Sequence, residues 1–287
     1  MPSLKSLRKR IASVRNTQQI TKAMKMVSAA KLRRAQDAAI AARPYSEKLS
    51  ALLAGVASGM PADAHPLLRS TGQVRRIDLL LVTSDRGLCG AYNSNLIRQA
   101  EGLVRENRER QVSLTVIGRK GFDYFRRRQA TIGERYVQIG SPGIALARTI
   151  AARLTARYAA EETDRIVLLY AAFRSALSQV PTFVTLLPIS ASEVEAAGGA
   201  APEYLMEPDT RTLLDRLLPQ YIETRIFGAL LEATASEHGA RMTAMDSASN
   251  NAAEMIFSLT LQMNRARQAA ITKELMEIVS GAEALKG

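Results

Sequence analysis

Apolar residues recur at helical spacing over long stretches at both ends of this chain. Near the N-terminus they are Leu4, Leu7, Ile11 and Val14, then Ile20, Met24 and Val27. Near the C-terminus they are Met255, Leu259, Met263 and Ala266, then Ile271, Leu275 and Ile278. Steps of three and four place such residues in one narrow stripe on a mostly polar helix, which is typical of helices that wind around a partner helix. The pattern predicts that the two ends pair as an antiparallel coiled coil.

The two predicted helices are unusually long. The first has no proline between Ser3 and Arg43 and can run to about Ala57, while the second is bounded by Pro208 and Gly281. At ~1.5 Å per residue they span roughly 80 and 110 Å, whereas an average globular helix has about 12 residues. We therefore expect much of each helix to contact solvent or another protein. Pro219 removes a helical hydrogen bond and predicts a kink or break, with a continuous helix only from about Gln220.

Between these helices the pattern changes to short apolar runs. Four runs, at 77–83, 112–118, 166–172 and 182–187, are typical of buried strands. Helical stretches at 93–107, 120–127 and 143–160 separate them. Strands alternating with helices predict an α/β fold with a Rossmann-like, parallel-rich sheet. We expect this domain at 75–190, between an N-terminal coiled-coil helix at 1–57 and a C-terminal one at 209–287.

Charge is concentrated on the first helix. The 287-residue chain carries a net charge of +12. Residues 1–43 hold eleven Lys or Arg and one Asp, a net +10, whereas residues 209–287 hold eight basic and ten acidic groups, a net −2. Exposed helices usually mix both signs, so a one-sided helix indicates an acidic partner: nucleic acid, anionic lipid or acidic loops of another protein. A purely solvated face is the ordinary alternative.

Composition narrows the class of protein. No window approaches eighteen apolar residues without a charge, and the basic N-terminus lacks the apolar core of a secretion signal. The single cysteine, Cys89, rules out an internal disulfide, which fits a reducing cytoplasm. Tryptophan is absent and aromatic residues make up 5%, so platforms for stacking bases are not expected.

Sites for catalysis or nucleotide binding are not predicted. The turn after the first strand, SDRGLCGAYNSNL at 84–96, lacks the GxGxxG spacing, and no GxxxxGK[ST] occurs. Gly87 and Gly90 are instead expected to permit a tight turn, with Ser94 or Asn95 capping the next helix. Cys89 in this turn is expected to be a buried, inert thiol. His65 and His238 lie too far apart in sequence to indicate a metal site or a triad, so we expect no cofactor.

Four segments carry a resemblance to a known family. They are KSLRKRIASVRNTQQITKAMKMVSAAKLRRAQ at 5–36, TSDRGLCGAYN at 83–93, LSQVPT at 177–182 and NRARQAAITKELMEIVSGA at 264–282. Together, and in this order, they resemble the gamma subunits of F-type ATP synthases over essentially the whole chain. The resemblance implies a rotating central stalk without a catalytic site. Its coiled coil would enter a ring of three alpha and three beta subunits, and would couple proton flow through the membrane c ring to ATP synthesis or hydrolysis.

The resemblance also implies contact residues and a location. Positions that match contacts with the alpha and beta subunits are Lys22, Met24, Lys25, Arg241, Arg267, Gln268, Thr272 and Glu274. Tyr204 and Glu207 match the region that faces the epsilon subunit and the c ring. The expected location is peripheral, on the cytoplasmic face of a bacterial inner membrane. A mitochondrial matrix location is less favoured because no transit peptide is seen. The single cysteine excludes the disulfide switch that chloroplast forms carry.

Two other classes of protein compete with this interpretation. A DNA-binding coiled-coil protein would use residues 5–34 as its basic region, but basic-zipper proteins place that charge before their heptads. Here Lys22 and Lys25 are interleaved with the apolar residues Ile20, Met24 and Val27, which argues against nucleic acid as the partner. A nucleotide-dependent enzyme would require the isolated chain to bind nucleotide.

Overall fold

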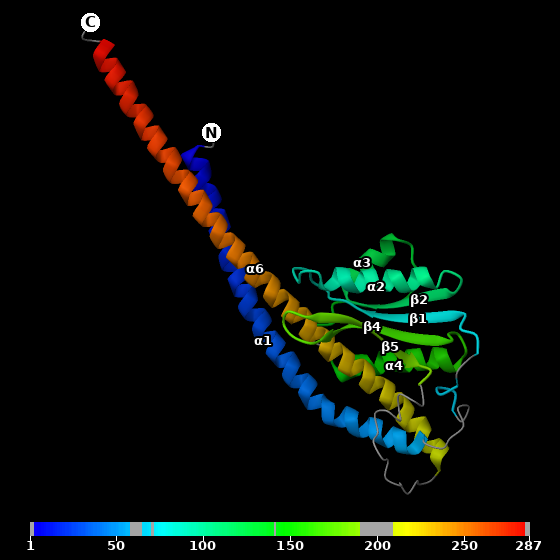
Figure 1. The fold of residues 1–287 in the computed structure, drawn as a ribbon. Helices are drawn as coiled ribbons and strands as arrows, with labels where there is room; N and C mark the ends of the chain where they lie inside the picture. The colour runs from blue at the N-terminus through cyan, green and yellow to red at the C-terminus, as the bar shows by residue number, and fades with distance from the viewer. Residues whose placement is uncertain (1–2, 58–64, 70–71, 141, 190–208, 285–287) are drawn as a thin grey trace. The chain divides into compact units, whose positions relative to one another are not determined.

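The computed structural model describes residues 3–57, 65–69, 72–140, 142–189 and 209–284 (Figure 1). Its elements in chain order are α1 Leu4–Ala57, β1 Arg76–Val82, α2 Tyr92–Glu106, β2 Gln111–Ile117, α3 Arg119–Arg127, β3 Ile132–Tyr136, α4 Ile144–Ala159, β4 Arg165–Phe173, β5 Gln179–Leu187 and α6 Thr210–Ala284. They form two compact units. The coiled-coil unit combines Met1–Val27 with Met242–Gly287, and the α/β unit is Ser28–Arg241. Both α1 and α6 contribute to each unit.

The α/β unit is built on a five-stranded sheet with the order β3-β2-β1-β4-β5. β1 pairs in parallel with β2 and with β4, and β2 pairs in parallel with β3. Among the strands that the structure describes, only β5 runs antiparallel, as the second strand of a hairpin with β4. The predicted parallel-rich α/β fold is therefore confirmed. The sequence pattern missed β3, because this edge strand, IGERY, has an apolar residue only at each end.

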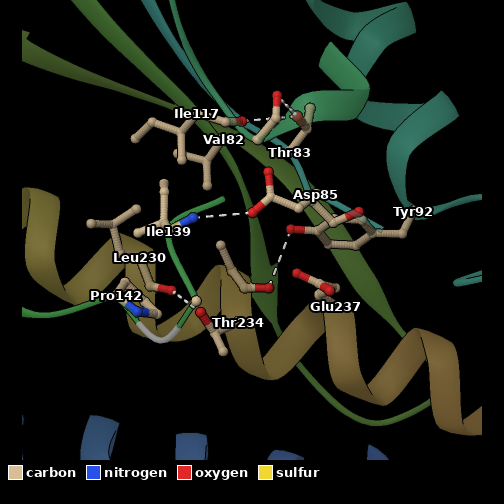
Figure 2. Close-up of a pocket in the computed structure, with 14 residues that line it drawn as sticks. Val82, Thr83, Asp85, Tyr92, Ile117, Ile139, Pro142, Leu230, Thr234 and Glu237 are labelled. Carbon is tan, nitrogen blue, oxygen red and sulfur yellow. Dashed lines mark hydrogen bonds between the residues drawn. The ribbon is translucent and has the colours of Figure 1, made fainter. Parts of the chain in front are cut away.

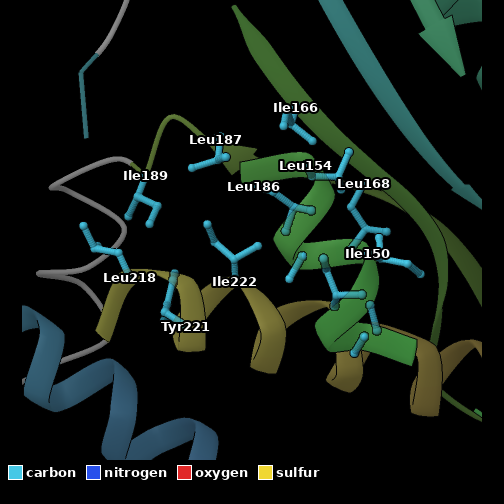
Figure 3. Packing of buried hydrophobic residues seen from close by; sticks show 14 of the residues in the cluster. Ile150, Leu154, Ile166, Leu168, Leu186, Leu187, Ile189, Leu218, Tyr221 and Ile222 are labelled. Carbon is cyan, nitrogen blue, oxygen red and sulfur yellow. The ribbon is translucent and has the colours of Figure 1, made fainter. Parts of the chain in front are cut away.

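Alternate residues of the central strand serve two cores. Ile77, Leu79 and Leu81 face a cluster that includes Leu96 of α2 and Phe125 of α3. Leu80 and Val82 of β1 face the opposite side, because successive side chains of a strand point to opposite faces. That second core includes residues of α4, of the last turns of α1 and of the first half of α6. Figure 3 shows side chains of α4 and α6 meeting there beside β4 and β5, among them Ile150, Leu154, Leu218 and Ile222.

The coiled-coil unit contains an antiparallel pair of helices, as predicted. Leu7 and Ile11 of α1 are buried against Leu259 of α6. Further along, the Gln18 amide donates to the carbonyl of Ser249 at 3.4 Å, and Lys25 Nζ lies 2.5 Å from Asp246 Oδ1. The α6 number falls as the α1 number rises, so the helices run in opposite directions (Figure 1).

The interhelical seam departs from its predicted course after Val14, which still packs in the cluster shared with α6. Ile20 and Val27 were expected in the seam, but their exposed fractions are 60% and 57%. Thr21 and Ser28 are buried in their place. The buried stripe keeps a strict heptad spacing from Leu7 and Ile11, and that spacing arrives at small polar residues. The apolar residues at 20, 24 and 27 are one position out of phase with it.

The seam on α6 also needs correction. Met255 is 51% exposed, while its neighbour Ile256 packs against the α1 residues. Ile271, Leu275 and Ile278 were expected to continue the seam, but all three are at least half exposed. The apolar cluster shared with α1 reaches Met263 and Ala266 on α6, and α6 continues to Ala284. The residues beyond this cluster cannot be buried by α1, because α1 begins at Leu4.

The expected break at Pro219 is absent, since α6 is one helix from Thr210 to Ala284. Proline removes one backbone donor and crowds the preceding turn. The residues around it, Leu214, Leu218 and Ile222, are each at most 1% exposed. Burial of this apolar face fixes the helix on both sides of Pro219, so tertiary packing outweighs the local cost of the proline.

Candidate functional site

The C-terminal part of α6 presents apolar side chains to solvent. We call residues 271–282 the tip. Within it Ile271, Leu275 and Ile278 are 50%, 57% and 67% exposed, and Met276 and Val279 are 61% and 56% exposed. Residues 271, 275, 276, 278 and 279 share one face of the helix, an arc of roughly 160°, because each step turns by about 100°. Large apolar surfaces of this kind mark sites of interaction with another protein or a membrane.

Polar residues flank and interrupt the apolar tip. Arg267, Gln268, Thr272 and Glu274, all predicted contact residues, are exposed. Lys273 and Glu277 form an exposed ion pair along the helix, at 3.5 Å. The structure therefore brings the four predicted residues together with the apolar side chains on one segment of helix. A partner that buries the tip would also meet these polar groups.

The predicted contact residues on α1 differ in their surroundings. Lys22 is exposed, and Met24 is half-buried. Lys25 lies in the seam, where its ammonium group contacts Asp246, and the two side chains are 42% and 46% exposed. Asp246 was missed by sequence reasoning. The signal that could have found it is an acidic residue beside the seam of the opposite helix, next to the buried Met245.

Arg241 lies in the α/β unit and is buried, at 7% exposed. Its guanidinium donates to the backbone carbonyls of Arg86 at 3.2 Å and Gly87 at 3.2 and 3.3 Å. It also pairs with Glu237 one turn earlier on α6, at 2.7 Å. The structure does not bring Arg241 together with the tip residues. It places the side chain against the turn between β1 and α2.

That turn is formed differently from the prediction. Positive φ angles occur at Leu88 (61°) and Gly90 (56°), and Gly87 does not share them. Neither Ser94 nor Asn95 caps α2, whose N-cap is Ala91 without a side-chain hydrogen bond. A residue that the sequence reasoning overlooked, Asn93, closes the turn instead. Its amide accepts from the Ser84 N–H at 3.0 Å and donates to the Ser84 hydroxyl at 2.8 Å.

Cys89 is buried inside this turn, as expected. The residue is 2% exposed, and its thiol accepts a hydrogen bond from the Asn93 amide at 3.2 Å. Burial raises the pKa of the Cys89 thiol. A protonated, enclosed thiol is a poor nucleophile, so the residue serves packing.

A small cavity lies at the carboxyl ends of β1 and β2 (Figure 2). Its volume is about 50 Å³, enough for a few waters, whereas ligand pockets usually measure about 300–1,000 Å³. Two carboxylates line it, Asp85 and Glu237. Asp85 accepts from the backbone N–H groups of Gln138 and Ile139, at 3.0 and 3.2 Å. Negative lining and small volume both disfavour a nucleotide phosphate here.

The described residues do not meet what a metal site or a membrane-spanning helix requires. Within the described ranges, no group of three or more His, Cys, Asp or Glu side chains could hold a metal ion. No described helix is both apolar and long enough to span a bilayer. The predicted contacts Tyr204 and Glu207 lie outside the described residues.

His238 makes the stability of this region dependent on pH. Its Nδ1 lies 3.2 Å from Arg241 Nη1, and it accepts that hydrogen bond only when it is neutral. Burial, with the nearby charges of Arg241 and Lys31, lowers the pKa of His238 to about 4. Below about pH 6.5 the unfolded chain therefore takes up a proton that the folded chain refuses, so stability is lost as pH falls from 6.5 toward 4.

We expect His238→Gln, which keeps a hydrogen-bond acceptor without a titrating ring, to remove this loss. Between pH 7.5 and pH 5 the free energy of unfolding of the unaltered chain should fall by about 2 kcal/mol more than that of the variant. Urea titrations at the two pH values measure the difference. Equal losses in both proteins would show that His238 is not the group responsible.

Comparisons with known proteins agree over the full length of the chain. The sequence model of the ATP synthase family matches residues 3–285. The ATP synthase gamma chains of Trichlorobacter lovleyi and Geobacter metallireducens are 50% identical over 289 residues and 53% identical over 292, with 100% of each chain covered.

Solved structures show the same fold. A chain of the central stalk and c ring of Tetrahymena thermophila mitochondrial ATP synthase is 27% identical, with a TM-score of 0.62 over 80% of this chain and 99% of that one. A chain of the Euglena gracilis mitochondrial enzyme, at 20% identity, has a TM-score of 0.70 over 98% of this chain and 94% of its own. With a family match over almost every residue and relatives at half identity, this chain belongs to the ATP synthase gamma-chain family.

Proposed function

We propose that this central-stalk subunit is the rotating shaft of a proton-translocating ATP synthase and carries no catalytic site itself. In this role it is one component of an enzyme complex whose bond chemistry takes place on other subunits. The helices at 1–57 and 209–287 form the shaft, and the α/β domain at 75–190 forms the body that connects it to the membrane ring. The exposed apolar tip of α6 carries this proposal.

The tip is suited to act as a bearing, that is, a segment that turns inside a sleeve formed by other subunits. Its exposed apolar side chains make contacts without a preferred direction. Its five large apolar side chains are each at least half exposed, on a helix that continues beyond the cluster shared with α1. Burying one such side chain in a sleeve of other subunits contributes about 1.5–3 kcal/mol. Apolar contact has no preferred direction, so a helix held in this way can turn. Arg267, Gln268, Thr272 and Glu274 would supply the contacts that differ from one beta subunit to the next.

Charge on α1 supports contacts that form and break as the shaft turns. The first 43 residues carry a net +10, and the resemblance implies an acidic loop on each beta subunit. Exposed ion pairs contribute only about 0–1 kcal/mol each, so rotation past three equivalent subunits would not be locked. Lys22 is exposed and free to join such contacts, whereas Lys25 would have to exchange its contact with Asp246.

The opposite end of the shaft would meet the membrane part of the enzyme. Tyr204 and Glu207 are proposed to contact the epsilon subunit and the c ring. The similar Tetrahymena chain is described as part of a central stalk and c ring, which supports association with a c ring, whereas the choice of these two residues follows from the family resemblance alone. We propose a peripheral position on the cytoplasmic face of a bacterial inner membrane, consistent with the bacterial sources of the similar gamma chains.

Reconstitution tests the proposal directly. We expect purified alpha and beta subunits of a bacterial relative to form a stable ATPase when this chain is added. With the epsilon subunit and the membrane sector present, ATP should drive proton uptake into vesicles. ATPase activity, gel filtration and quenching of a pH-sensitive dye measure the three steps. If the alpha and beta subunits neither bind the chain nor change their ATPase activity when it is added, the proposal is wrong. Nucleotide turnover by the isolated chain would also contradict it.

A further inference from the structure

The part of α6 between Ala233 and Arg241 is held at several points by the sheet and by the segments next to it. The Tyr92 hydroxyl, from α2, donates to the carbonyl of Ala233 at 3.2 Å (Figure 2). The Ser236 hydroxyl donates to the carbonyl of Ala171 in β4 at 2.9 Å. At Gly239 a Cβ atom would lie 3.3 Å from the Ala176 Cα, so the hairpin after β4 packs closely on the helix.

Arg241 is the last of these ties and the strongest. Its guanidinium spans two consecutive carbonyls of the β1–α2 turn, and Glu237 balances its charge. Hydrogen bonds from a charged donor are roughly twice as strong as neutral ones. The planar fork of arginine holds two acceptors in a fixed geometry, which the single ammonium group of lysine cannot do. Arg241 is also the last residue of the α/β unit, and α6 continues without a break into the coiled-coil unit.

We propose that Arg241 is a positioning residue that fixes α6 to the β1–α2 turn, so that torque passes between the α/β body and the shaft without slack. The inference rests on the proposed function. It differs from the expectation that Arg241 contacts the alpha and beta subunits, because the side chain is buried and its donors point to carbonyls of its own chain. Arg241 affects coupling through the turn it holds.

The turn itself supports this role. Leu88 has a φ of 61° and is 64% exposed. A large residue in this backbone region is unfavourable unless its surroundings hold it there. The turn is held from inside by Asn93 and from α6 by Arg241. Loss of the guanidinium would leave the turn free to relax and would release α6 from it.

The test compares four variants in the reconstituted complex, with the ratio of ATP-driven proton pumping to ATP hydrolysis as readout. Arg241→Ala should lower this ratio at least fivefold while hydrolysis continues. The alpha and beta subunits would still turn the shaft, but α6 would be only loosely attached to the β1–α2 turn. Arg241→Lys should lower it about twofold. Glu237→Gln, which leaves the guanidinium without its counter-charge, should also lower it. Arg216→Ala, at an exposed position of the same helix, is the matched control and should leave the ratio unchanged.

Hydrogen exchange on the isolated chain separates the anchor from a contact with another subunit. Arg241→Ala should speed exchange at least tenfold in residues 84–91 and 236–245, and circular dichroism should show that the helices remain. An unchanged pumping ratio in Arg241→Ala would overturn the inference. So would a lowered ratio with unchanged exchange and an unaffected Glu237→Gln, because Arg241 would then act through another subunit. If the unaltered chain fails to restore pumping, the proposed function fails, while the exchange measurement still decides whether Arg241 anchors the turn.

Discussion

Gly118→Ala is expected to destabilise the α/β unit by at least about 4 kcal/mol, which is exceptional for a single methyl group. Gly118 follows β2 with a φ of +90°, and a Cβ atom there would lie 2.2 Å from the Thr83 carbonyl oxygen and 2.6 Å from its carbon. Both contacts are with backbone of the neighbouring strand end, so no flexible side chain can move aside. The Gly118 N–H is also bonded to the Tyr136 carbonyl at 2.8 Å, which ties this position to β3.

Urea unfolding of the isolated chain, followed by circular dichroism, measures the effect. Gly102→Ala is the matched control. Gly102 lies inside α2 with nothing within 4 Å of an added Cβ, so the change should stabilise the chain by about 0.5–1 kcal/mol through helix propensity. A loss of less than 1 kcal/mol in Gly118→Ala would show that the strand ends can separate at low cost.

Replacing Ile271, Leu275 and Ile278 together by serine is expected to weaken binding to the alpha and beta subunits at least a hundredfold. Each side chain is at least half exposed in the chain alone. Each substitution would remove roughly 1.5 kcal/mol or more of the binding free energy that burial of the side chain contributes in the complex. A change of 1.4 kcal/mol corresponds to a tenfold change in affinity. The unfolding midpoint of the isolated chain should stay the same, because these residues are not part of its cores.

Titration of the alpha and beta subunits with labelled chain measures the affinity. Ile40→Ser, an equally exposed isoleucine on α1, controls for the change of residue type and should leave affinity unchanged. A second variant with Arg267, Gln268, Thr272 and Glu274 all changed to alanine tests the polar contacts. It should lower the rate of coupled ATP synthesis more than it lowers affinity. Undiminished binding of the triple serine variant would contradict a bearing at the tip.

The sequence predicts the fold well where residue type and position agree. Leu7 and Ile11 are apolar and occupy seam positions, so their burial follows from their spacing. Ile20 and Val27 also have helical spacing, which wrongly predicts burial. Both side chains lie on the face of α1 that points away from α6 and are exposed. No local pattern separates the two stripes, since the choice depends on which face the partner helix covers. The seam is set by contacts between residues more than two hundred positions apart.

The errors at Pro219 and in the β1–α2 turn have the same origin. A proline penalty is local, whereas the packing of Leu218 and Ile222 against the sheet that outweighs it is tertiary. In the turn, Leu88 takes a backbone conformation that favours glycine, because Arg241 and Asn93 hold the loop from both sides. Arg241 itself could be matched to a family position by sequence, but its carbonyl partners could not be deduced from spacing.

The Lys25–Asp246 pair affects how α1 and α6 align along the coiled coil. Two helices with heptad spacing can slide past each other by seven residues and still present a seam. Such a slip would move Lys25 from Asp246 to face Ala253 in one direction or Gly239 in the other, and neither has a carboxylate to pair with its ammonium group. A single polar pair can select one alignment of a coiled coil from several. The pair with Asp246 thus adds to the apolar packing of Leu7, Ile11 and Leu259 in favouring the alignment in which the tip projects beyond the start of α1.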